Sequence, residues 1–113
     1  MAREIKESDW KVFRRLHSIA LERFCQRVIE EIRSVTVDCS KEDHDCYLKV
    51  FALLGDRDKE IAEAFNDPRR SNAFILLLSI KAKGLLTDEE LMQFSPELRE
   101  AIEATGCMLS LKR

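Results

Sequence analysis

The residue types best suited to chemistry gather between positions 39 and 46, in the segment Cys-Ser-Lys-Glu-Asp-His-Asp-Cys. Thiolate and imidazole groups bind zinc, and this segment supplies three of them beside carboxylates. It has no Cys-x-x-Cys pair, however, and a zinc site would need a fourth ligand from elsewhere in the chain. The candidate ligands are Cys39, His44 and Cys46, with His17, Cys25 or Cys107 as the fourth.

The spacing of these ligands argues against joint binding of one metal ion. If Ser40 caps a helix here, His44 and Cys46 project about 200° apart around its axis. We therefore expect no bound metal and no other cofactor. A thiol or metal site that uses Cys39, His44 and Cys46 stays the alternative function.

Single thiols and histidines are weaker candidates for catalysis. Cys39 lies near an expected helix start, where a helix dipole can activate a thiol, but no neighbouring base is evident. His17 occupies the apolar face of the first expected helix, where packing at the core edge is favoured over acid–base chemistry. His44 is flanked by two aspartates, and we expect it to face solvent. These patterns favour a protein that is not an enzyme.

A basic cluster next to another expected helix start offers an anion site. Arg69, Arg70 and Asn72 could receive a phosphate or carboxylate through guanidinium groups and exposed amides. Nearby aspartates, Asp67 among them, can neutralise these arginines, so a salt-bridged loop is favoured. Anion or nucleic-acid binding at this cluster is a second alternative. Nucleic acid is a disfavoured ligand because no aromatic residues interleave with the arginines.

Composition sets the class of protein that must hold these residues. The 113 residues are 45% hydrophobic and 35% charged, which suits one soluble domain over residues 1–113. Only 3 glycines and 2 prolines occur, fewer than a tightly turned sheet needs, so an all-helical fold is indicated. The formal charge of -2 gives no field toward nucleic acid or an anionic membrane. No export signal or membrane span is apparent, so we expect four free thiols and a cytoplasmic protein.

The first expected helix is long and has two apolar surfaces. Ser8 can cap it, and it runs from Asp9 to about Arg33 without Gly or Pro. Its main stripe must be buried in a core. Val12 and Ile19 lie off this stripe on one flank, and they suggest a second contact with a neighbouring helix or with another copy of the chain.

Turn and cap residues divide the rest of the chain into further helices. The expected boundaries are a helix from a Ser40 cap to Gly55, a short one from Asp56 to about Asn66, a helix from Pro68 to Gly84, one after a capping box at Thr87 and Glu90, and one from Ser95-Pro96 to Gly106. The helix over about 68–83 has apolar residues on all sides, so we expect it at the centre of the fold.

Two segments do not fit this helical pattern. Residues 34–39 alternate β-branched side chains and suit an extended linker or a short strand, with 107–111 as the one candidate partner. Residues 107–113 form an apolar tail that we expect to dock on the domain or on a second subunit. Residues 1–7 are expected to be flexible.

The sequence thus predicts a compact all-α bundle of five or six helices around the central helix at about 68–83, with one minor strand pair as an option. The favoured function is a non-enzymatic module that binds a protein partner or self-associates, with a homodimer as the sharper form. The interface candidates are Val12, Ile19, Met108, Leu109 and Leu111.

Overall fold

The computed structural model describes residues 4–39 and 42–111, with side chains described as far as Thr105. These residues form five helices and no β-strand, which confirms the all-helical class. The helices are α1 (Glu7–Asp38), α2 (Asp43–Phe65), α3 (Ala73–Ala82), α4 (Asp88–Leu91) and α5 (Pro96–Leu111). None of the described helices is both long enough and apolar enough to cross a membrane.

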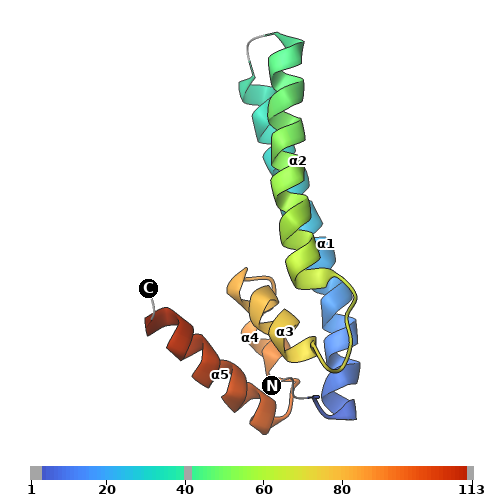
Figure 1. Cartoon of the computed structure of the whole chain (residues 1–113), viewed down its shortest axis with the longest axis vertical. Coiled ribbons are helices and arrows are strands. Elements are labelled where there is room, and N and C mark those ends of the chain that lie inside the picture. The colour runs from blue at the N-terminus through green and yellow to red at the C-terminus, as the bar shows by residue number, and fades with distance from the viewer. Residues whose placement is uncertain (1–3, 40–41, 112–113) are drawn as a thin grey trace.

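The chain is more extended than the compact bundle that we predicted, and it measures 54 × 30 × 26 Å along its principal axes. α1 and α2 form a long antiparallel hairpin, and α3, α4 and α5 gather around one end of it (Figure 1). We call this end the base. The rest of the hairpin, residues 29–39 and 42–60, projects from the base as a two-helix arm (Figure 1).

The hydrophobic core of the described residues lies in the base. α1 contributes a stripe at helical spacing, from Phe13 to Val28, and the other helices close over it. The buried apolar residues are Ile5, Phe13, Leu16, Ala20, Phe24, Val28, Ala64, Phe65, Ala73, Leu76, Leu77, Ile80, Leu85, Phe94, Leu98 and Ile102. The arm holds none of them, so its two helices are joined along a single seam of half-buried side chains.

α1 is longer at both ends than the sequence suggested. It begins at Glu7, so Ser8 is a helical residue and not the cap, and it continues through 34–38. The β-branched residues there disfavour a helix by only about 0.5 kcal/mol each, and of the three only Val35 is half-buried. The Thr36 hydroxyl has a hydrogen-bond partner within the helix, because it donates to the Arg33 carbonyl at 2.9 Å. Because 107–111 is also helical, the predicted strand pair is wrong.

α2 runs through Gly55 without a break, so the predicted end at Gly55 and the new start at Asp56 are both wrong. Glycine in a helix interior costs about 1 kcal/mol relative to alanine. The next turn offsets this cost, because the Arg57 guanidinium donates to the Glu31 carboxylate of α1 at 2.9 Å and also binds Glu60. Glu42 precedes α2 as its cap residue, and the predicted cap Ser40 lies outside the described residues.

α3 begins at Ala73, five residues after the predicted start at Pro68. Asp67 has a left-handed φ of 49°, and residues 68–72 form a turn that the Asn72 side chain ties together. Its carboxamide oxygen accepts from the Arg69 N–H at 2.7 Å, and its amide donates to the Asp67 carbonyl at 3.1 Å. This turn supplies the hydrogen bonds that an earlier helical turn would have made.

α3 is also less enclosed than the sequence predicted. Ala73, Leu76, Leu77 and Ile80 are buried, but Ile75 is 63% exposed, so one side of the helix faces outward. The end at Gly84 agrees with the sequence, because Gly84 has a left-handed φ of 69° that favours glycine.

Arginines of α1 attach the end of α3 to the hairpin. Arg27 donates to the carbonyls of Lys83 and Gly84 at 2.7 and 2.8 Å, and Arg23 donates to the carbonyl of Leu85 at 2.8 Å. Carbonyls at a helix C-terminus carry partial negative charge, so cations are stabilising there. The two arginines therefore fix where α3 ends against α1.

The starts of α4 and α5 agree with the sequence. Thr87 and Glu90 form the predicted capping box: the Thr87 hydroxyl accepts from the Glu90 N–H at 3.1 Å, and the Glu90 carboxylate accepts from the Thr87 N–H at 2.8 Å. α5 starts at Pro96, and the Ser95 hydroxyl accepts from the Leu98 N–H at 3.3 Å. Gly106, predicted to end the last helix, lies inside α5.

Candidate functional site

An uncovered apolar surface runs along the arm on α2. We call it the α2 stripe, and it consists of Tyr47, Leu48, Phe51 and Leu54. Tyr47 is 63% exposed and Phe51 is 66% exposed, and their rings stack with centroids 6.3 Å apart. Soluble monomers seldom place large aromatic and aliphatic side chains together on an open surface, so a patch of this kind marks a contact site.

The stripe follows from the helical spacing of α2. Cys46, Val50, Leu53 and Arg57 are half-buried along the seam with α1, and at 100° per residue the stripe is centred about a third of a turn away from them. Phe65 falls on the same side of the helix as Tyr47, and it is buried in the core. The stripe is therefore the uncovered continuation of a side of α2 that the base encloses.

Gly55 makes a notch in this surface. It lies one turn from Phe51 and two turns from Leu48 on the same side of α2, where i and i+4 residues are neighbours. A Cβ atom placed on Gly55 would meet nothing within 4 Å. The glycine is therefore not required by packing within the chain, and the space above it is open to a side chain from outside.

The outer side of α1 carries a smaller apolar surface. Ile29 is 48% exposed, and it lines a shallow hollow of about 530 Å³ together with Ile19 and Cys25. Val12 and Ile19, two interface candidates from the sequence, are half-buried and pack against the core cluster of the base. The other interface candidates, Met108, Leu109 and Leu111, have side chains outside the described part of the chain.

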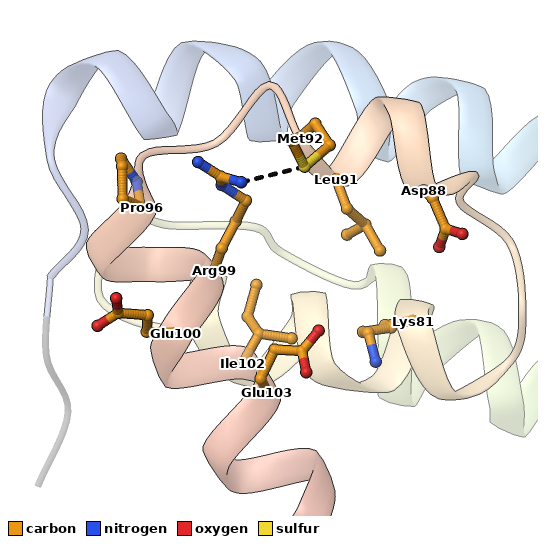
Figure 2. Close-up of a pocket in the computed structure, with 9 residues that line it drawn as sticks. All are labelled: Lys81, Asp88, Leu91, Met92, Pro96, Arg99, Glu100, Ile102 and Glu103. Atoms are coloured by element: carbon orange, nitrogen blue, oxygen red, sulfur yellow. Dashed lines mark hydrogen bonds between the residues drawn. The ribbon is translucent and has the colours of Figure 1, made fainter.

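A larger hollow, of about 680 Å³, lies where α3, α4 and α5 meet (Figure 2). Leu91 and Ile102 give it an apolar floor, and Arg99 reaches across to Met92, with Nη1 3.0 Å from Sδ (Figure 2). The other charged lining residues are Lys81, Asp88, Glu100 and Glu103. Charges of both signs lie around the rim, and these residues include no nucleophile paired with a base.

A second hollow of about 530 Å³ lies between the start of α1, α3 and α5. Ile5, Phe74 and Leu98 line it, and the Lys6 ammonium and Glu97 carboxylate form an ion pair at 2.8 Å on its rim. Ile5 is buried and its carbonyl accepts from Arg70 at 2.8 Å, so the segment before α1 is tied to the turn before α3. The segment before α1 is thus connected at this hollow both to the turn before α3 and to the start of α5.

Cys39 and Cys46 carry the two thiols nearest the tip of the arm among the described residues. Cys39 follows α1 and Cys46 lies in the first turn of α2, and both are half-buried. The neighbouring Cys39 thiol is the main cause that raises the pKa of Cys46 above its ordinary value, and burial adds to this effect. His44 is exposed, and no group of three metal-ligating side chains comes together within the described residues. The structure therefore places Cys39 and Cys46 near the same end of the arm, without a group of three metal ligands among the described residues.

His17 and the basic cluster have structural contacts. The His17 ring packs between Phe13 and Phe65, its Nε2 lies 3.2 Å from the Phe65 carbonyl, and burial lowers its pKa. Arg69 forms an ion pair with Asp67 at 2.6 Å, and Arg70 donates to the Ile5 carbonyl. These side chains hold the turn before α3 and the base of the hairpin, and an incoming anion would have to compete with those contacts.

Comparison with protein-family models, with curated proteins and with solved structures finds no match for this chain.

None of the stripe residues is among the interface candidates predicted from the sequence. The signal that could have found them is the width of the apolar arc on α2. Residues 46, 50 and 53 already provide one strip for the neighbour α1, whereas 47, 51 and 54 add a parallel strip beside it. A helix with a single neighbour along its length needs only one such strip.

Proposed function

We propose that this chain is a non-enzymatic interaction module of the cytoplasm that self-associates, and that a second copy of the chain covers the α2 stripe. The observation that carries the proposal is the open stacked pair of Tyr47 and Phe51 on an arm that projects away from the core. Four large apolar side chains on one exposed helix face form the kind of contact surface used by paired helices.

The chemistry of the stripe fits a second copy placed antiparallel about a two-fold axis at Phe51. In that register Phe51 faces its own counterpart, Leu48 faces Leu54, and Tyr47 faces Gly55, whose surroundings are open. A ring over a glycine is the knob-into-hole packing that lets two helices approach closely. At the ends of the pairing His44 faces Asp58, a hydrogen-bond donor opposite an acceptor.

Charge and area set the strength of this contact. A formal charge of -2 on each copy gives little repulsion between them. With about 150–250 Å² on each aromatic side chain, the exposed parts of the stripe contribute roughly 400 Å² per copy, or about 800 Å² in total, which is below the limit of about 1,000 Å² for a specific, stable interface. We therefore expect a weak dimer whose population depends on protein concentration.

Light scattering after size-exclusion chromatography tests the proposal. The mass of the wild-type chain should rise with concentration from 13.1 kDa toward twice that value. Phe51→Asp should stay monomeric, because it places a charge at the centre of the stripe. The matched control is Ile75→Asp, since Ile75 is 63% exposed but lies on α3, and this variant should dimerise as the wild type does.

Two results would contradict the proposal. A wild-type mass that stays at the monomer value at the highest attainable concentration would leave the stripe for a different protein as its occupant. An equal loss of dimer in the Phe51→Asp and Ile75→Asp variants would place the contact elsewhere on the surface.

A further inference from the structure

Polar contacts with the end of α3 mark one of the two broad faces of the hairpin. The Arg57 guanidinium joins Glu31 of α1 to Glu60 of α2. The Glu60 carboxylate also accepts from the ammonium of Lys83, the residue that directly follows α3, at 3.4 Å. Arg27 of α1 donates to the Lys83 carbonyl at 2.7 Å. Arg27, Glu31 and Glu60 therefore lie on the face where α3 ends, and we call the opposite side of the arm the open face.

Helical spacing places two isoleucines of α1 on the open face. Val28 and Val35 mark the seam of α1 with α2, because Val28 is buried, Val35 is half-buried, and they are seven residues apart. At 100° per residue, Glu31 lies about 50° to one side of this seam. Ile32 lies about 50° to the other side, and Ile29 lies about 110° from the seam on that same side. Both isoleucines therefore turn away from the face where α3 ends.

Three residues of the α2 stripe turn to the same face. Glu60 lies about 50° from the seam of α2, on the side where α3 ends. Tyr47, Phe51 and Leu54 lie about 90°, 130° and 70° from the seam on its other side. The stripe and the two isoleucines of α1 thus belong to one face of the arm.

The two apolar rows lie side by side along the arm. The contact between Glu31 and Arg57 sets the level of α1 against α2. With a rise of about 1.5 Å per residue, Ile32 and Leu54 lie within about 3 Å of each other along the arm axis. Thr36, one turn beyond Ile32, is exposed and uncharged. The middle of the open face is therefore built from uncharged side chains of both helices.

We propose that the whole open face, and not the α2 stripe alone, pairs with a second copy, so that two arms form an antiparallel four-helix bundle. This inference rests on the proposed self-association and adds α1 to the contact. A two-fold axis that crosses the open face at the level of Phe51 places α2 against α2 and α1 against α1 of the second copy. It keeps the register proposed for the stripe.

Area and charge favour a contact built by both helices. The α2 stripe alone falls short of a stable interface by about 100 Å² per copy. Ile29 is 48% exposed and Thr36 is also exposed, so α1 can supply the missing area. Glu30 and Asp38 lie on other sides of α1, so pairing through the open face would not bury their charges.

Sedimentation velocity over a series of protein concentrations tests the contribution of α1. Ile29→Glu should raise the dissociation constant of the dimer at least about tenfold, because it places a charge in an apolar contact. The matched control is Val37→Glu, since Val37 is 81% exposed but lies on the side of α1 that faces away from α2. This control should change the dissociation constant less than about twofold.

A second variant tests the same face in the opposite direction. Thr36→Leu adds apolar area to the open face and should lower the dissociation constant by about threefold to tenfold. All three positions are exposed in the monomer, so each variant should keep the helical circular dichroism of the wild type.

The outcomes separate this inference from the proposed self-association. If Phe51→Asp abolishes the dimer while Ile29→Glu and Thr36→Leu keep the wild-type dissociation constant, pairing through α2 stands and the contribution of α1 is overturned. Equal weakening by Ile29→Glu and Val37→Glu would also overturn it, because added charge and not position would then explain the loss. A wild-type chain that stays monomeric at the highest attainable concentration would overturn both.

Discussion

The carboxylate of Asp9, near the start of α1, accepts hydrogen bonds from the backbone N–H of Ser95 at 2.8 Å and from the Ser95 hydroxyl at 2.7 Å. Asp9 is only 3% exposed, and Ser95 in turn accepts from the first turn of α5. Residues 86 positions apart in the chain are thus joined at one helix start. This contact fixes α5 to the base of the hairpin.

Asp9→Ala should lower the free energy of unfolding by about 2–3 kcal/mol, because it removes two hydrogen bonds to a charged acceptor in a buried place. Urea unfolding measures the change. Glu63→Ala, at an exposed position on α2, is the control and should change stability by less than about 0.5 kcal/mol. Equal losses in the two variants would show that α5 does not depend on the Asp9 contact.

Glu90 predicts a pH dependence of stability. The Arg23 guanidinium and the Thr87 N–H hold the pKa of Glu90 at about 2, below its ordinary value of 4.5. Because the pKa is lowered by folding, the ion pair contributes fully above pH 4.5, and its contribution is lost as the pH falls toward 2. Arg23 is 37% exposed, so solvent screening limits this contribution to about 1–2 kcal/mol.

Glu90→Gln should therefore unfold more easily than the wild type at neutral pH, and the difference should shrink between pH 4.5 and 2. Denaturant titrations at a series of pH values give this difference directly. Glu89→Gln is the control, because Glu89 is exposed on the same short helix. A Glu90→Gln difference that does not change with pH would contradict the ion-pair explanation.

Gly55→Ala should stabilise the monomer by about 0.5–1 kcal/mol, because α2 is helical there and a Cβ atom meets open space. Thermal unfolding in the Phe51→Asp background separates this effect from any pairing of chains. Ala62→Gly, also exposed on α2, should destabilise by a similar amount. Destabilisation by Gly55→Ala would mean that α2 is not a continuous helix at this position.

Local signals in the sequence predicted the parts of the fold that local chemistry decides. The Thr87 capping box, the Ser95-Pro96 start and the glycine end at Gly84 each depend on residues within one turn, and the structure has all three. The predicted cap at Ser8 and the predicted helix end at Gly55 are wrong for the opposite reason. Contacts with distant residues carry α1 and α2 past the positions where local preference would start or stop a helix.

The candidate site could be predicted only in part. Cys39 and Cys46 lie near the same end of the arm because α1 and α2 pack antiparallel, whereas the sequence indicated only two thiols on either side of a helix start. The exposure of Tyr47 and Phe51 depends on where α3–α5 pack, because a helix packed over them would have buried both side chains. The length of the arm beyond the base was not visible in any local pattern.

Photo-crosslinking from position 51 tests the central claim most directly. In Phe51→p-benzoylphenylalanine an aromatic ring is kept at the centre of the α2 stripe, and irradiation joins it to whatever covers that surface. A covalent dimer linked to residues 47–55 of the second copy is the predicted product, and the same substitution at Ile75 should give none. Irradiation that leaves the chain monomeric, or that links it to a region outside α2, would contradict the account.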